Sequence, residues 1–327
     1  MITLIGSPQS KRTYYFMQAA RALKTPVTVL TYSQALTATL TGAVKIDPPV
    51  HSETDICQIN ALSQEYIRFL QAMAARKNVN YVNHPAGLIS LLDKKICKKR
   101  LIEHGIPTPP LVAENVGSVE QLLAIMQASK ITRMFIKPTL GSGAAGVIAW
   151  RRHPDGIRQV LYCAIAIDGS RLFNSNKIHS YQDDVQIRRI ISAVLQQENI
   201  VECWLPKASV NGKSYDLRVV CMDGKILWRV VRTSSQPITN LHLQNQASEF
   251  ASLGLSAAKV AEIDALCLNA IQLFPDIRLA GIDVLLTRNL TPYIIEINGQ
   301  GDLIYQDAQN ENHIYRAQIQ AIRSQYV

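Results

Sequence analysis

The sequence predicts an α/β region followed by an α+β region, and three observations lead to this fold class. Residues 1–83 alternate strand-like and helix-like segments, as in an α/β domain with a parallel sheet. Two Asp-Gly dipeptides, at residues 168–169 and 223–224, stand between apolar runs and predict β-hairpins. Residues 280–299 predict a further hairpin near the C-terminus.

The first region contains two predicted strands and two predicted helices. "MITLIG" is read as a strand, since no basic stretch or long apolar core marks it as a secretion signal. A helix over 11–24, a strand over 26–32 and a helix over 61–76 follow. The loop at Gly6 lacks the three-glycine dinucleotide fingerprint, so it is assigned no cofactor.

The segment 84–110 predicts one long helix, with Pro85 in its first turn and Gly105 and Pro107 ending it. Its run "DKKICKKR" is expected to be mostly a solvated helix face. The Asn-His-Pro sequence before this helix marks a domain boundary near residue 83. The predicted domains are 1–83, 84–200 and 201–327.

The second region is read as antiparallel strands around one helix. A hairpin over 158–178, a helix over 183–199 and strands within 200–208, 215–232 and 280–299 are predicted. The segment 155–181 either extends a sheet, which we favour, or lines the substrate cleft.

Composition favours an ordinary globular chain that binds an anion. The chain has 327 residues, 47% hydrophobic and 18% charged, and a net charge of +9. That charge favours a nucleotide, or weak nonspecific nucleic-acid contact. No apolar run is long enough to cross a membrane. Its six cysteines are scattered without a metal-binding pair, which predicts core fillers in a reducing cytoplasm.

A glycine-rich loop follows Lys137 within "MFIKPTLGSGAAGVIAW". A P-loop would place the lysine after the glycines and before a helix. Here Lys137 comes first and a strand follows, so the loop suggests a lid whose N–H groups close over phosphate. Taken alone, a plain structural turn explains it better.

Two carboxylates and an amide stand in the terminal hairpin. Glu296 and Asn298 are two residues apart and therefore point to the same face of a strand, and Asp283 lies on the partner strand. Such oxygen donors suit Mg²⁺, which usually keeps water and substrate phosphates as further ligands. Strand ends that face water are an equally good explanation of these residues alone.

Taken together, the order of these features resembles the ATP-grasp superfamily, and most closely its RimK-like amino-acid ligases. The resemblance covers about 84–305, and 1–83 fits the Rossmann-like domain that precedes a two-lobed ATP-grasp core. The fragments "LFNS", "WLPKA", "VVRTS" and "TNLHLQN" resemble a poorly characterised bacterial branch of these proteins.

The resemblance assigns roles residue by residue. Lys94 and Lys137 would bind ATP phosphates, Glu202 would meet the adenine amino group, and Asp216 would lie near ribose. The lid would comprise Gly141, Ser142, Gly143 and Gly146, and the interlobe segment Cys203, Trp204 and Leu205.

The remaining roles concern the reaction itself. Arg218 would lie near the transferred phosphate, Arg232 near the acyl phosphate or the acceptor, and Asn240 near the phosphates and metal. Asp283, Glu296 and Asn298 would bind Mg²⁺. His242 is expected to be structural.

The resemblance implies a cytoplasmic ligase that uses ATP and Mg²⁺ to join a carboxylate to an amine through an acyl phosphate. Two Mg²⁺ ions are expected, with Mn²⁺ as a substitute. The substrate would be a small metabolite or a peptide. No membrane and no specific nucleic acid is expected, and a homo-oligomer stays open.

Two alternatives remain. One is an ATP-grasp kinase that phosphorylates a hydroxyl; the other is a non-catalytic nucleotide-binding or basic nucleic-acid-binding protein. The loop "NGQGDLIY" replaces the N-A-S-P-G usual in RimK-like ligases, so glutamate specificity is not carried over and the role of 299–302 stays open.

Overall fold

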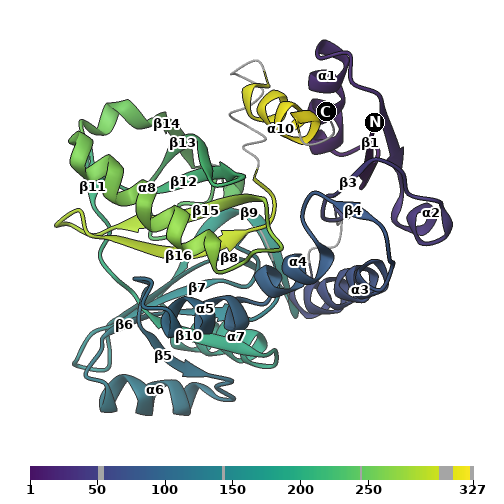
Figure 1. The fold of residues 1–327 in the computed structure, drawn as a ribbon. Helices are drawn as coiled ribbons and strands as arrows, with labels where there is room; N and C mark the ends of the chain where they lie inside the picture. Colours follow the sequence, from purple (N-terminus) through teal and green to yellow (C-terminus); the bar gives the residue numbers. More distant parts are fainter. Residues whose placement is uncertain (51–54, 142–143, 244, 302–311, 325–327) are drawn as a thin grey trace.

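The protein is built around three sheets, seen here in a computed structural model (Figure 1). The structure describes residues 1–50, 55–141, 144–243, 245–301 and 312–324, without the side chains of Cys57 and His242. Among these residues no helix is long and apolar enough to span a membrane.

The N-terminal sheet is parallel, with strand order β2-β1-β3-β4. Its strands are β1 (Ile2–Ile5), β2 (Val27–Leu30), β3 (Ala43–Ile46) and β4 (Asn80–Tyr81). The helices associated with it are α1 (Lys11–Ala22), α2 (Tyr32–Thr37), α3 (Ile56–Ala74) and, from the far end of the chain, α10 (His313–Ser324). Figure 1 shows α10, in yellow, beside α1, in purple, and the rings of Phe16 and Tyr315 meet edge to face at 6.1 Å.

The middle sheet is antiparallel, with order β5-β10-β6-β7-β8-β9. Its strands are β5 (Leu111–Glu114), β6 (Arg133–Pro138), β7 (Ile148–Arg152), β8 (Gln159–Asp168), β9 (Arg171–Tyr181) and β10 (Asn199–Cys203). The helices α6 (Val119–Ala128) and α7 (Asp184–Leu195) cover the face that carries Met134, Ile136 and Trp150. The opposite face, with Phe135 and Lys137, is left to the cleft between the sheets.

The C-terminal sheet has the order β14-β13-β12-β15-β16, with β11 beside β12. Its strands are β11 (Ser209–Val210), β12 (Lys213–Met222), β13 (Lys225–Ser234), β14 (Gln246–Glu249), β15 (Leu279–Leu286) and β16 (Pro292–Asn298). The helix α8 (Ala257–Gln272) packs on its apolar face, and two short 3₁₀ helices span Leu241–Leu243 and Phe250–Leu253.

These sheets confirm the predicted α/β and α+β fold class, including both Asp-Gly hairpins. The segment 155–181 contains all of β8 and β9, so it extends the middle sheet. The predicted domain limits stay predictions, and the one between residues 200 and 201 falls inside β10.

The single helix predicted after residue 84 is wrong, because the chain forms α4 (Pro85–Leu92) and α5 (Lys94–Glu103) instead. Asp93, in an extended conformation, ends α4 and caps α5 by accepting the N–H groups of Lys95 and Ile96, each at 2.9 Å. An aspartate at this position satisfies donors that a continuous helix would not leave free. Lys94 therefore begins a helix.

Candidate functional site

A pocket lies where α5, the middle sheet and β16 meet. Its charged lining residues, which we call the lysine pocket, come from both facing sheets and from α5: Lys94, Lys98, Lys137, Glu202 and Glu296. Three ammonium groups against two carboxylates leave a surplus of positive charge. Such a pocket favours a polyanion.

Lys94 reaches the glycine-rich loop. Its backbone N–H donates to Thr139 at 3.0 Å, and its Nζ donates to the carbonyl of Gly141 at 2.6 Å. Burial lowers the pKa of Lys94, and the nearby Glu296 carboxylate offsets part of that effect. The α5 N-terminus is thus fixed against the segment that was predicted to cover phosphate.

The described part of the glycine-rich loop depends on glycine at two positions. Gly141 has φ +128° and Gly146 φ +71°, which side chains disfavour. A Cβ at Gly146 would also lie 2.6 Å from a ring carbon of Pro138. Ser142 and Gly143, also predicted for this lid, lie outside the described residues.

Glu202 is 2% exposed and lies between two lysines. Its carboxylate accepts from Lys137 Nζ at 2.6 Å and pairs with Lys98 Nζ at 2.8 Å. Burial raises the pKa of Glu202, but the two ammonium groups lower it by more, so it stays below its ordinary value. Both oxygens are engaged in this structure, and contact with adenine stays a prediction.

Lys98 corrects the expectation of a solvated helix face, because it is only 3% exposed. It also donates to the Thr108 hydroxyl at 2.6 Å, and burial lowers its pKa. Lys98 is four residues after Lys94, on the same face of α5. That spacing was the sequence signal that could have paired the two lysines.

The facing surface of the C-terminal sheet carries a second cluster, centred on Asp216. Asp216 and Arg218 share one face of β12, while Leu217 packs into the core. Asp216 accepts from Arg232 Nε at 2.7 Å and Lys207 Nζ at 3.0 Å. Burial raises the pKa of Asp216, but these two cations lower it by more, so it lies below its ordinary value.

Two residues with predicted roles lie inside this cluster. Asp216 is 2% exposed, and the hydroxyl of Thr239 also donates to it, so protein groups hold its oxygens in this structure and contact with ribose stays a prediction. Arg232 is 7% exposed and is therefore a buried member of the cluster.

The predicted metal ligands lie together at the end of this network. Asp283 and Glu296 are register partners on β15 and β16. Arg218 donates to Asp283 at 2.7 Å, and Arg232 pairs with its other oxygen at 3.3 Å. With the amide of Asn298 oriented to satisfy its neighbours, it donates to Glu296 at 3.1 Å and accepts from Arg218 at 2.8 Å.

The donors suit Mg²⁺ chemically, since all three supply oxygen. Asp283 is held by two arginines here, so a cation would compete with them for its oxygens. Across the described ranges, no group of three or more His, Cys, Asp or Glu side chains is placed to hold a metal. An Mg²⁺ ion bound by these two carboxylates and the amide would therefore take oxygens of phosphate or water as its further ligands.

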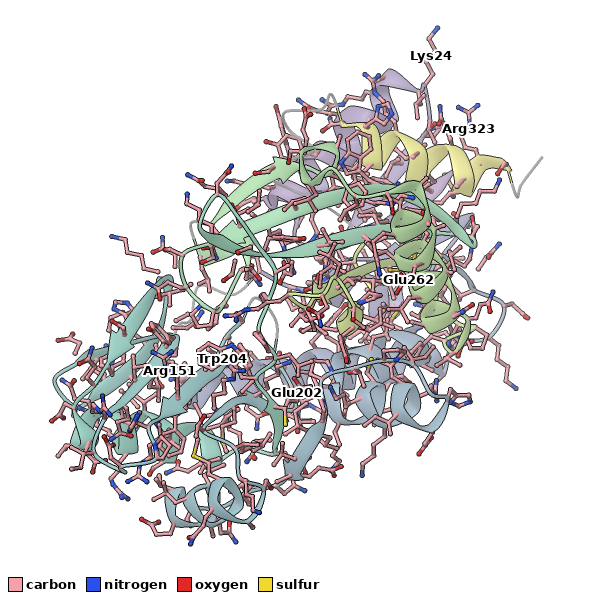
Figure 2. The ribbon with its side chains drawn as sticks, turned by 90° about the vertical axis from the view of Figure 1, so that its left-hand side faces the viewer. Lys24, Arg151, Glu202, Trp204, Glu262 and Arg323 are labelled. Atoms are coloured by element: carbon pink, nitrogen blue, oxygen red, sulfur yellow. The ribbon has the colours of Figure 1, made fainter. Side chains whose placement is uncertain are left out.

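The interlobe segment and Asn240 complete the predicted residues. Cys203 donates its backbone N–H to Pro110 at 2.9 Å, Leu205 is half-buried, and the Trp204 ring packs against Phe135 and Tyr162 at 5.5 and 6.4 Å. Figure 2 labels Glu202, near the end of β10, and Trp204, just after that strand. Asn240 is half-buried at the start of the first 3₁₀ helix, and the side chain of His242 lies outside the description.

Comparison with known proteins identifies the fold. No protein-family model matches the sequence, and no curated protein matches it. Among solved structures, D-cycloserine synthetase DcsG superposes with a TM-score of 0.64 at 13% identity, covering 99% of each chain. The ATP-grasp ligase PsnB in complex with a minimal precursor superposes with a TM-score of 0.60 at 13% identity, covering 99% of this chain and 98% of that one. D-alanine–D-alanine ligase from Bacillus anthracis with ATP superposes with a TM-score of 0.57 at 15% identity, covering 99% of this chain and 96% of that one.

These matches define a fold that extends over nearly the whole chain. It is the ATP-grasp fold. At such identities the likeness establishes the architecture and leaves the activity to be argued from the residues of the cleft.

Proposed function

We propose that the protein is an ATP-dependent ligase that joins a carboxylate to an amine through an acyl-phosphate intermediate. The observation that carries the proposal is the meeting of Lys94 and Lys137 with Glu296 in one pocket. Cations that bind phosphate oxygens and a carboxylate that binds a metal must share one triphosphate for this chemistry.

The lysine pocket supplies binding and charge neutralisation. Lys94 and Lys137 would contact phosphate oxygens, and Lys137 would then exchange Glu202 for phosphate while Lys98 keeps the Glu202 carboxylate paired. Positioned cations in a site with little water stabilise the charge that develops during phosphoryl transfer. The glycine-rich segment beside Lys94 would exclude water from the acyl phosphate.

The C-terminal hairpin would hold the metal. Asp283, Glu296 and Asn298 would bind Mg²⁺, with Mn²⁺ as a substitute and a second ion as part of the proposal. The metal would supply a Lewis acid that neutralises phosphate charge. Arg218, which now contacts Asp283, would be positioned to assist the same oxygens, and Arg232 would hold Asp283 in place.

The RimK-like branch and the cytoplasmic location belong to the same proposal, supported by the motifs in the sequence. The substrate class is a small metabolite or a peptide. PsnB, which has the same fold, has been solved in complex with a precursor peptide. A peptide substrate is therefore a reasonable first choice in a screen.

The test is ATP turnover with pooled carboxylates and amines, with mass spectrometry of the products. We expect ADP, phosphate and an amide, formed only when both substrates and Mg²⁺ are present. A product that keeps the phosphate and needs no amine would assign a kinase. ATP binding that is unchanged by Mg²⁺ or by Asp283→Asn with Glu296→Gln, without turnover, would favour a non-catalytic nucleotide-binding protein.

A further inference from the structure

A second cavity lies on the other side of the interlobe segment. It is open to solvent and has a volume of about 280 Å³, close to the lower end of the usual range of ligand pockets, about 300–1,000 Å³. We call it the arginine cavity after three of its lining residues, Arg133, Arg151 and Arg288. The lining residues of the arginine cavity and of the lysine pocket do not overlap.

The arginines come from both sides of the cleft. Arg133 and Arg151 are register partners on β6 and β7, so their side chains leave the same face of the middle sheet. Arg288 comes from the turn between β15 and β16 in the C-terminal sheet. Figure 2 shows Arg151, on β7, labelled close to Trp204, which follows β10. The cavity therefore presents like charges from two parts of the protein.

None of the three arginines has a side-chain hydrogen bond or ion pair with any residue that the structure describes, whereas Arg218 and Arg232 in the neighbouring cluster are fully engaged. Like charges that line one cavity repel each other, and an anion between them removes that cost. Guanidinium groups match carboxylate and phosphate oxygens through paired hydrogen bonds. Their free donors point to an oxyanion ligand.

The rest of the lining adds an aromatic and a polar component. Trp204 and Tyr162 form an aromatic corner, and the cavity is also lined by Ser214 of β12 and by Ser235 and Gln236 of the loop after β13. Lys207 also lines it, but that lysine is already paired with Asp216. A ligand with an apolar or planar body and separated charged ends would match this distribution.

We propose that the arginine cavity binds a ligand that carries two or more carboxylate or phosphate groups and connects the two sides of the cleft. One anionic group lies against Arg133 and Arg151, and another lies against Arg288. The ligand restrains opening of the cleft, because its charges attract cations on both sheets. This inference does not depend on ligase activity, since binding is measured by itself.

The experiment is calorimetric titration of the full chain with two probes, tricarballylate for carboxylates and inorganic triphosphate for phosphates. Each titration is run at fixed free Mg²⁺, with and without a saturating non-hydrolysable ATP analogue. We expect saturable binding of at least one probe in the presence of the analogue. The stronger probe identifies the anion class.

Three single variants should each weaken that binding by about 10- to 100-fold, because each removes charged hydrogen bonds to the ligand. They are Arg133→Ala, Arg151→Ala and Arg288→Ala. Arg133→Lys keeps the charge and loses the paired geometry, so it should weaken binding less than Arg133→Ala. Arg171→Ala is the matched control. Arg171 is also exposed, and its side chain has no hydrogen bond or ion pair with the residues that the structure describes. It lies on β9, at the other end of the middle sheet.

Three results would overturn the proposal. The first is that neither probe shows saturable binding at millimolar concentration. The second is that the ATP analogue abolishes binding of the probe. The third is that the three alanine variants leave binding unchanged, or that Arg171→Ala weakens it equally. The second result would move the anion site to the lysine pocket. Melting temperatures of all variants confirm that they fold.

Discussion

Two buried carboxylates lie on different sheets, and each is held between two cations. Glu202 is held by Lys98 and Lys137, and all three line the lysine pocket. Asp216 is held by Lys207 and Arg232, and its contacts continue to Asp283. The first cluster ends at a pocket with surplus positive charge, whereas the second is a connected series in which cations and carboxylates alternate.

The difference separates two uses of buried charge. Lysines have flexible stems and can exchange a carboxylate for a phosphate, which suits a cluster that receives a ligand. Arginines with two or more fixed partners keep a carboxylate at one position, which suits a cluster that aligns metal ligands. Four experiments examine this contrast.

The largest effect is expected for Asp216→Asn. Removing one charge leaves Lys207 buried without its carboxylate and Arg232 with Asp283 alone, so the free energy of unfolding should fall by about 3–5 kcal/mol. Chemical denaturation measures it. Glu262→Gln is the control, since the Glu262 side chain is 48% exposed on α8 and pairs with Lys259, and its cost should stay below about 1 kcal/mol. Equal losses in both variants would remove the distinction between the clusters.

Glu296→Gln should affect activity rather than folding. Under the proposed function, it removes one metal ligand, and ATP turnover should fall by about 100- to 1,000-fold, as when one strong electrostatic contact is lost. The readout is kcat/KM for ATP at saturating Mg²⁺. Glu262→Gln on the outer face of α8, labelled in Figure 2, is the control and should leave turnover unchanged. Turnover within twofold of the native protein would exclude Glu296 from the reaction.

Lys137→Met and Lys207→Met compare the two clusters directly. Lys137→Met should raise KM for ATP about 10- to 100-fold with an unfolding free energy within about 1 kcal/mol, because Glu202 keeps Lys98. Lys207→Met should lower the unfolding free energy by about 1–3 kcal/mol with a smaller change in KM. The reverse pattern would show that the Asp216 cluster is the one that binds nucleotide.

The smallest effect concerns pH. The pKa values of Glu202 and Asp216 are both lower in the folded chain than their ordinary values of 4.5 and 3.8. Their stabilisation is therefore present above those values and is lost as the pH falls through the lower, folded values. The unfolding free energy should decline below about pH 4.5, and more gradually in Glu202→Gln. An equal slope in that variant would mean that other carboxylates control acid unfolding.

Much of the fold was predictable because its signals are local. Asp-Gly turns, the glycine-rich loop and the alternation of the first 83 residues each act over a few positions. The signal that separates α4 from α5 at Asp93 was also local, since an aspartate before "KKI" is a helix-capping pattern. It was missed because the helical spacing of apolar residues continues through this position.

The site was predictable only in part, because partners come from distant strands. The spacing of Glu296 and Asn298 placed them on one face, and the register with Asp283 agrees with that reading. The burial of Lys98 depends on Glu202, far away in sequence, and no periodicity in α5 alone reveals such a partner. Likewise, the arginine cavity exists only after two sheets face each other.

The docking of α10 on α1 has a consequence for synthesis on the ribosome. Phe16 is fully buried and packs edge to face against Tyr315, so part of its cover emerges roughly 300 residues later. At about 5–20 residues per second, that interval lasts about 15 to 60 s. During it the nascent chain exposes an aromatic surface to solvent, and packing around the N-terminal sheet is complete only after the last helix has formed.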